Sequence, residues 1–256
     1  MRTAGIDIGS ISTKAAVLED GAILGTKVGF TGYNAGAAGR KMFDEILDSL
    51  GIEESSISRI VSTGYGRNSV DFAHKSMTEI ICHGAGAHFL NPQIRTVVDV
   101  GGQDSKALIL DASGRVSDFV MNDKCAAGTG RFLEVMARAL EVDLDEFGEL
   151  SLHSENPSKI SSICTVFAES EVISLISKGE PRENIIAGIH ESVASRVYAM
   201  SQRLAVKPPL MMSGGVAKNI GVVRALEKRF SSPIEVTEYA QVNGAIGAAV
   251  LAGTLS

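Results

Sequence analysis

The chain has 256 residues, 45% of them apolar, and carries a formal net charge of -6 at pH 7. It can bury a full core, best as one bilobed unit, and its scattered basic residues disfavour nucleic-acid backbone binding as the main task. No apolar run approaches membrane-spanning length, and Asp7 stands where a signal peptide would need its apolar region. We therefore expect a cytoplasmic protein without a membrane segment, whose partners are proteins and small molecules.

The first predicted elements form a hairpin around residues 6–15. An apolar strand carries Asp7, a turn of small and hydroxyl residues follows, and Lys14 precedes a second apolar strand. Glycine lets the backbone approach a polyanion, so that main-chain N–H groups and hydroxyls can face phosphate oxygens. Lysine adds a point charge, and aspartate can hold hydrated magnesium. One such stretch is weak evidence for phosphate binding, because most glycine-rich turns bind nothing.

A helix, a strand and a second helix are predicted next. Apolar residues at helical spacing between Phe43 and Leu50 indicate a helix that stops at Gly51. A strand over 57–61 follows, and then a helix from about 76 to 90, which must end before Pro92. The next strand opens at Val97, which places a lobe boundary near 91–96.

Residues 98–107 repeat the pattern of residues 6–15 with equal internal spacing. Aspartate, glycine and lysine recur at the same positions of the pattern, whereas Asp104 replaces Ser12. Two copies are much stronger evidence than one and point to a nucleotide held between two related lobes. Asp99 and Lys106 of this copy either help the phosphates or stabilise their own hairpin. There is neither a P-loop nor a Rossmann fingerprint in the sequence.

The second lobe carries an insertion over about 118–179 that contains Cys125 and Cys164. With Cys82 they leave an odd cysteine in any disulfide scheme, so free thiols or metal ligands are the better interpretations. A buried free cysteine is the usual state of this residue, and Cys82 is interpreted as a packed helix cysteine. Cys125 and Cys164 each precede an amphipathic run, which predicts that both thiolates stand at helix N-termini.

The remaining elements complete the second lobe. A helix over 185–204 shows one apolar face, a strand over 210–212 enters a glycine turn, and Asn219 is expected to open the next helix. The last helix, over 243–249, has small residues at close spacing and is suited to packing tightly against another backbone.

The paired hairpins and the segment 213–219 resemble the actin, sugar kinase and chaperone ATPase superfamily. Within it, residues 98–106, 121–132 and 164–171 look like the ATP-dependent activators of 2-hydroxyacyl-CoA dehydratases and the related benzoyl-CoA reductase ATPase subunits. The resemblance covers essentially the whole chain.

This resemblance implies an α/β fold of two ribonuclease-H-like lobes with the nucleotide in the interlobe cleft. Lobe I is expected over residues 1–95, completed by a C-terminal helix at about 240–256. Lobe II is expected over 96–239, with the cysteine-bearing insertion and an adenosine loop at 213–219.

The resemblance also implies an ATPase that is a homodimer with one 4Fe-4S cluster at its two-fold axis, ligated by Cys125 and Cys164 of each subunit. ATP hydrolysis would drive a low-potential electron into a partner iron-sulfur enzyme that acts on an acyl-CoA or related substrate. Ferredoxin or flavodoxin would be the external donor, in an anaerobic setting. A symmetric dimer is a simple way to supply four thiolates when one chain offers two.

Three groups of site residues are expected. The candidate catalytic residues are Asp7, Asp104 and Gln103, of which Asp7 and Asp104 are expected to hold hydrated Mg²⁺ or to orient the attacking water. ATP or ADP is expected to be bound by Gly9, Ser10, Ile11, Ser12, Thr13, Lys14, Gly101, Gly102, Gln103, Gly214, Gly215, Val216, Asn219 and Gln241. The expected cluster ligands are Cys125 and Cys164.

Other functions are open at this point. A small-molecule kinase of the same fold would need a substrate pocket and an aspartate base, and an actin-like scaffold would polymerise with ATP. Zinc could replace the cluster between subunits. The partner could instead be an aromatic-CoA reductase or another double-cubane enzyme. The substrate is not encoded here, because acyl-CoA chemistry would occur on the partner.

Overall fold

The computed structural model describes residues 1–160 and 164–255. The chain divides into two compact units. The first comprises Met1–Val97, Leu108–Asp118 and Glu238–Ser256, and the second comprises Val98–Ala107 and Phe119–Thr237. The predicted insertion over 118–179 includes residues 161–163, which lie outside the described residues.

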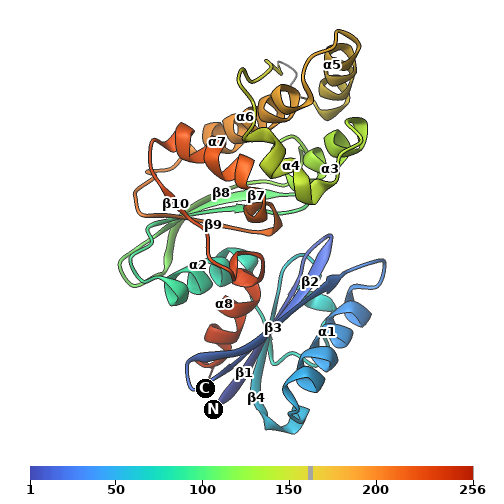
Figure 1. The fold of residues 1–256 in the computed structure, drawn as a ribbon. Coiled ribbons are helices and arrows are strands. Elements are labelled where there is room, and N and C mark those ends of the chain that lie inside the picture. The colour runs from blue at the N-terminus through green and yellow to red at the C-terminus, as the bar shows by residue number, and fades with distance from the viewer. Residues whose placement is uncertain (161–163, 256) are drawn as a thin grey trace. The chain divides into compact units, whose positions relative to one another are not determined.

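The first unit contains a five-stranded sheet in the order β3-β2-β1-β4-β5 (Figure 1). Its strands are β1 (Arg2–Ile8), β2 (Ser12–Glu19), β3 (Ala22–Phe30), β4 (Ile57–Thr63) and β5 (Lys75–Ser76). Its helices are α1 (Ala35–Leu50), α2 (Glu79–Leu90) and α8 (Asn243–Ala252), with short 3-10 turns at Glu54–Ser56, Arg67–Ser69 and Ala240–Val242. β1 pairs antiparallel with β2 and parallel with β4.

Alternating residues of β2 bury themselves in different hydrophobic clusters. Val17 packs in the same cluster as Phe43 of α1, whereas Ala16 packs in the same cluster as Ile246 of α8. Successive side chains of a strand point to opposite faces of its sheet, so α1 and α8 cover the two faces (Figure 1). Full burial of Phe43 or Ile246 stabilises this layering by about 1.5–3 kcal/mol each.

Both ends of α1 are fixed by local sequence. The side chain of Asn34 accepts a hydrogen bond from the N–H of Ala37, which caps the N-terminus. Gly51 follows the last helical residue with φ 64°, a left-handed conformation that suits glycine. The predicted stop at Gly51 is therefore confirmed.

α8 packs directly on backbone, as its small residues predict. A Cβ atom at Gly247 would lie 1.7 Å from the carbonyl oxygen of Cys82 in α2, and one at Gly5 in β1 would lie 2.0 Å from the carbonyl oxygen of Ala245. Glycine at these two positions lets α8 approach both α2 and β1.

The second five-stranded sheet has the order β10-β9-β6-β7-β8. Its strands are β6 (Thr96–Val100), β7 (Ser105–Leu110), β8 (Val116–Asn122), β9 (Leu210–Ser213) and β10 (Ile234–Glu235). The helices of the second unit are α3 (Gly130–Ala139), α4 (Leu144–Ser151), α5 (Thr165–Ser177), α6 (Arg182–Ser201) and α7 (Ile220–Phe230), with a 3-10 turn at Gly215–Lys218. α6 packs against α7, and α4 contacts both.

The predicted elements exist, with shifted ends. The helix expected over 185–204 runs three residues earlier, because it starts directly after Pro181, whose fixed φ suits a helix entry. The helix expected from 76 begins at Glu79, and the strand expected to end at residue 61 continues to Thr63. Among the described residues, no helix combines the length and apolar character needed to cross a bilayer.

Candidate functional site

The turn between β1 and β2 is held by hydrogen bonds that leave its tip open. The N–H of Gly9 donates to the carbonyl of Ser12 at 3.1 Å, and the Thr31 hydroxyl donates to the carbonyl of Gly9 at 2.8 Å. Thr31 also shares a 2.9 Å hydrogen bond with the buried hydroxyl of Thr13. Ser10 at the tip is exposed. The buried hydroxyl of Thr13 therefore supports the turn through Thr31, whereas the side chains of Ser10 and Ser12 remain accessible.

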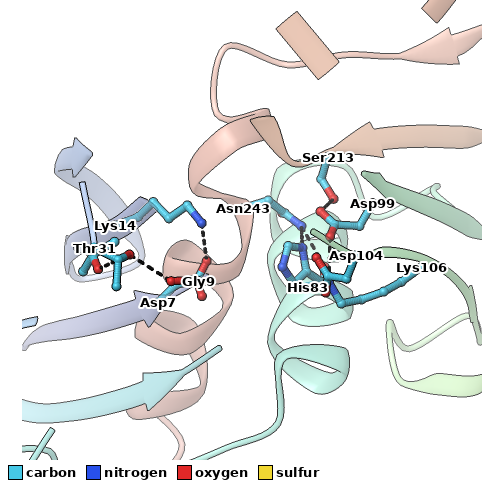
Figure 2. A network of polar contacts seen from close by, with 11 residues as sticks. Asp7, Gly9, Lys14, Thr31, His83, Asp99, Asp104, Lys106, Ser213 and Asn243 are labelled. Carbon is cyan, nitrogen blue, oxygen red and sulfur yellow. Dashed lines mark hydrogen bonds and ion pairs between the residues drawn. The ribbon is translucent and has the colours of Figure 1, made fainter. Parts of the chain in front are cut away.

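Asp7 lies below this turn in a slot lined by two glycines. Its Oδ2 is 3.3 Å from Nζ of Lys14 (Figure 2), and Asp7 as a whole is only 4% exposed. A Cβ atom at Gly64 would lie 2.4 Å from Oδ1, and one at Gly244 would lie 3.0 Å from Oδ2. Gly64 also has φ +84°, so a side chain there is excluded twice.

Two buried polar residues beside Asp7 were missed by sequence reasoning. Nδ2 of Asn243 donates to the carbonyl of His83 at 3.0 Å and lies 3.4 Å from Nδ1 of the same histidine (Figure 2). A Cβ atom at Gly244 would meet Nε2 of His83 at 2.9 Å as well as Oδ2 of Asp7 at 3.0 Å. The available signal was an asparagine opening an otherwise apolar helix and a histidine within a helix of small residues. Gln241 lies in the 3-10 turn just before α8 and is half-buried.

The turn between β6 and β7 closes in the same way as the first. The N–H of Gly101 donates to the carbonyl of Asp104 at 2.9 Å, which matches the bond from Gly9 to Ser12. Because a four-residue connection joins neighbouring strands, β6 and β7 form an antiparallel hairpin. Gln103 at the tip is exposed.

The second turn differs from the first in its lysine. Nζ of Lys106 lies 3.0 Å from Asp99 and 2.6 Å from Asp104, and Asp99 also accepts a hydrogen bond from Ser213 at 2.8 Å (Figure 2). The side chains of Lys106 and Asp99 are almost fully buried. A lysine paired with two carboxylates stabilises its hairpin, so of the two interpretations open for Lys106 and Asp99 the geometry favours the structural one.

The glycine turn after β9 runs alongside β6. Gly214 has φ +89°, and a Cβ atom there would lie 2.3 Å from the carbonyl oxygen of Val100. Gly215 begins the 3-10 turn and is exposed, whereas Val216 in it is buried. Gly214 is buried against β6, so the turn presents exposed backbone without a side chain at Gly215.

Asn219 opens α7, as predicted, and is itself positioned by a histidine. Its Oδ1 accepts from the N–H of Val222 at 3.1 Å, and its Nδ2 lies 3.2 Å from Nε2 of His190. Burial lowers the pKa of His190 to about 3, and Phe147 packs edge-on against its ring. A neutral His190 can accept the hydrogen bond of the Asn219 amide through Nε2.

α3 is hydrogen-bonded to the second turn. The N–H groups of Gly130 and Arg131, in the first turn of α3, donate to the carbonyls of Gly101 and Gly102 at 2.9 and 2.8 Å. These two N–H groups would otherwise lack helical partners. Displacement of the second turn therefore acts directly on the start of α3.

The prediction that Cys125 stands at a helix N-terminus is wrong. α3 begins at Gly130 with Thr129 as its N-cap, and Gly128 takes φ +99° in the turn between. Cys125 lies before this turn, and both its backbone N–H and its carbonyl are hydrogen-bonded to the Asn122 side chain. The glycine-rich stretch makes a turn of its own before the helix starts. Cys125 is half-buried, and its sulfur accepts a 3.2 Å hydrogen bond from Arg196.

The corresponding prediction for Cys164 is confirmed. Cys164 is the exposed N-cap of α5, with extended backbone angles. Cys82 is buried within α2, as expected for a packed cysteine. All three cysteines are free, and no group of three or more His, Cys, Asp or Glu side chains suited to a metal occurs among the described residues.

Comparison with known proteins adds the following findings. The profile of the BadF/BadG/BcrA/BcrD ATPase family matches residues 4–252. The chain is 49% identical to the activator of lactoyl-CoA dehydratase from Anaerotignum propionicum, covering 98% of this chain and 97% of that protein. It is 46% identical to the (R)-2-hydroxyglutaryl-CoA dehydratase activating ATPase of Acidaminococcus fermentans, with coverage of 98% and 96%.

Solved structures agree with the observed fold. Component A of the (R)-2-hydroxyglutaryl-CoA dehydratase from Acidaminococcus fermentans superposes with a TM-score of 0.96 at 44% identity, covering 99% of this chain and 98% of that one. The activator of the 2-hydroxyisocaproyl-CoA dehydratase from Clostridium difficile, with bound ADPNP, gives 0.93 at 45% identity, with coverage of 98% and 94%. The two five-stranded sheets thus match the predicted actin-like ATPase fold.

Proposed function

Because the chain belongs to the BadF/BadG/BcrA/BcrD ATPase family, we propose that it hydrolyses ATP and activates a 2-hydroxyacyl-CoA dehydratase by delivering an electron. The relatives named as activators of such dehydratases match this chain over nearly its whole length. The structure of one relative with bound ADPNP supports nucleotide binding by this fold.

The two matching turns are the proposed phosphate-binding elements. Exposed Ser10, half-buried Ser12 and half-buried Lys14 supply donors on the first turn. Gly102 and the exposed Gln103 supply backbone and side-chain donors on the second turn. Asp7 and Asp104 are the groups proposed to hold hydrated Mg²⁺ or to orient the attacking water, because both carboxylates lie at these turns.

Recognition of the nucleoside is assigned to the glycine turn after β9. Gly215 offers exposed backbone without a side chain in the way, and Gly214 lets the turn pack closely on β6. Asn219, held by His190, fixes the start of α7 beside that turn. Gln241 is assigned a supporting role before α8.

The proposed coupling between ATP hydrolysis and the cysteine segment rests on one observation, the pair of hydrogen bonds from the start of α3 to the second turn. Nucleotide-dependent movement of Gly101 and Gly102 would be transmitted to α3 and hence to the loop that holds Cys125. A hydrolysis-driven change at the cysteine segment needs a mechanical link of this kind.

Cys125 and Cys164 fit an iron-sulfur cluster by their chemistry. Both are free thiols, and neither is fully buried. Since no described group of three or more ligands exists in one chain, two copies would have to supply the four thiolates that a 4Fe-4S cluster uses. Such a cluster would accept and donate single electrons, with ferredoxin or flavodoxin as the class of external donor.

The cluster is tested by anaerobic purification of the full chain, with iron content and visible spectra before and after dithionite. About four irons per dimer and bleaching on reduction are expected. Cys125→Ser and Cys164→Ser should each lose iron, whereas the matched Cys82→Ser should keep it. A wild-type protein that stays colourless after anaerobic reconstitution would reject electron delivery.

ATP hydrolysis is tested with Asp104→Asn. The loss of negative charge should lower kcat more than ATP affinity if Asp104 serves magnesium or water, and Asp44→Asn on the exposed face of α1 is the control. Equal losses in both quantities would indicate a structural role for Asp104. Activation of a 2-hydroxyacyl-CoA dehydratase with ATP and a reductant then tests the partner.

A further inference from the structure

A cavity of about 520 Å³ lies in the second unit, and its lining includes no residue assigned above to nucleotide or cluster. Its walls are the middle of α6, the C-terminal end of α7 and the segment 157–160. The residues that line it are Pro157, Ser158, Lys159, Ile160, Gly188, Glu191, Ser192, Ser195, Arg196, Lys228 and Arg229.

The cavity concentrates positive charge on an acidic chain. Four cationic side chains face one carboxylate, that of Glu191. Lys228 and Arg229 share Glu191 at 2.8 and 3.1 Å. Lys159 and Arg196 have no carboxylate within ion-pair distance in the described part of the chain. The lining therefore carries a net charge of about +3, in a protein whose formal charge is -6.

Neutral donors accompany these charges. Ser192 and Ser195, one turn apart on α6, are half-buried, and neither hydroxyl has a hydrogen-bond partner within the residues the structure describes. Residues three apart on a helix share a face, so both hydroxyls lie on the side of α6 that lines the cavity. They are available to a ligand.

The opposite wall is fixed in place. A Cβ atom at Gly188 would lie 2.0 Å from the carbonyl oxygen of Ser158, so the segment 157–160 packs on the backbone of α6. The N–H of Ser158 donates to the carbonyl of Asn184 at 2.9 Å, and its hydroxyl donates to Glu180 at 2.9 Å. This wall of the cavity is therefore already in place without a ligand.

A hydrogen bond to Cys125 orients the side chain of Arg196. Its Nη2 donates to the sulfur of Cys125 at 3.2 Å, which holds one corner of the guanidinium. A guanidinium carries five N–H donors in a rigid fork, so the remaining donors can serve the cavity at a low cost in conformational entropy.

We propose that this cavity is a binding site for a small phosphate-bearing anion, a phosphate ester or diphosphate, held by Lys159, Arg196, Lys228 and Arg229 with Ser192 and Ser195. The volume is in the range of small-ligand sites. Arginine forks and hydroxyls are the groups that bind phosphate oxygens bidentately or by hydrogen bonds. The ligand is distinct from ATP of the proposed function, because no residue assigned to the nucleotide lines the cavity.

The test is isothermal titration calorimetry with pyrophosphate as the probe, on the full chain saturated with ADP and at constant ionic strength. Saturable binding to the wild-type protein is expected. Ser192→Ala/Ser195→Ala, which leaves the charge unchanged, should weaken binding at least threefold, and Lys228→Gln/Arg229→Gln at least tenfold. Lys41→Gln, an exposed cation of α1, should leave it unchanged.

Two outcomes would overturn the site. One is the absence of saturable pyrophosphate binding to folded wild-type protein up to millimolar concentration. The other is equal weakening by Lys41→Gln and by the cavity variants, which would indicate unspecific attraction by surface charge. Because ADP is present throughout and the ATPase is not the readout, failure of this site leaves the proposed function unaffected. Failure of ATP hydrolysis likewise leaves the site unaffected.

Discussion

Nζ of Lys106 lies 3.0 Å from Oδ2 of Asp99, in a pair whose side chains are 4% and 3% exposed. The corresponding lysine of the first turn, Lys14, is 14% exposed and contacts one carboxylate at 3.3 Å. Lys106 contacts a second carboxylate as well. The same position of a repeated pattern therefore has two different tasks.

We expect Lys106→Met to destabilise the fold by about 3–5 kcal/mol, because it leaves buried Asp99 without its cation. Urea unfolding measures the loss. Lys41→Met, which removes a 70% exposed lysine of α1, should change the free energy of unfolding by less than about 0.5 kcal/mol. A Lys106→Met protein as stable as the wild type would show that the pair is not what stabilises this hairpin.

Lys14→Met should instead weaken nucleotide binding by at least tenfold. Its side chain is 14% exposed, and its ammonium has three N–H donors, of which the contact with Asp7 needs only one. Titration with a non-hydrolysable ATP analogue measures the affinity, and Lys41→Met again serves as the control. Unchanged affinity in a folded Lys14→Met protein would remove Lys14 from the phosphate site.

His190 should make the protein sensitive to acid. The native state holds the pKa near 3 by burial, against an ordinary value of 6.5. Between these values the unfolded chain binds the extra proton, so the contribution is complete above pH 6.5 and is lost as the pH falls towards 3, by up to about 1.4 kcal/mol per pH unit.

Urea unfolding at pH 7 and pH 5 checks this dependence. Over that range the wild type should lose about 2 kcal/mol more than His190→Gln does, since only the wild type can protonate at this position on unfolding. Parallel losses in both proteins would contradict the assignment.

The three thiols should differ in reactivity. Burial raises the pKa of Cys82 to about 12, and the thiolate is the reactive species. In iron-free folded protein at pH 8, iodoacetamide should modify exposed Cys164 and half-buried Cys125 but not Cys82. Mass spectrometry of peptides measures each site, and the same reaction in urea should modify all three. Rapid native labelling of Cys82 would show that α2 opens readily.

Gly247→Ala should destabilise the first unit by about 1–3 kcal/mol, because its methyl group would overlap the backbone of Cys82 in α2. Gly253→Ala, just after α8, is the matched control, since its nearest neighbour is 3.3 Å away and its φ is -67°. Thermal unfolding of the two variants checks the difference. Equal midpoints would mean that α8 shifts without cost.

Local signals explain how much of the fold was predictable. Gly51 stops α1 and Asn219 caps α7 through interactions within a few residues, which a sequence window contains. The two hairpins were found because their pattern occurs twice. The residue at which α3 begins was not predicted, because Gly128 adopts a left-handed conformation that glycine permits but does not require. Cys125 was therefore placed at the wrong distance from its helix.

Sequence by itself determined which residue types are available: two turns that each carry aspartate, glycine and lysine, a third glycine turn, and two cysteines within the segment 118–179. Tertiary structure decided which of these groups remain accessible. Lys106 forms ion pairs with two carboxylates, and the hydroxyl of Thr13 is hydrogen-bonded to that of Thr31. Arg196 of α6 donates a hydrogen bond to the sulfur of Cys125. Burial and pairing depend on contacts between residues far apart in the chain, and no local pattern encodes those distances.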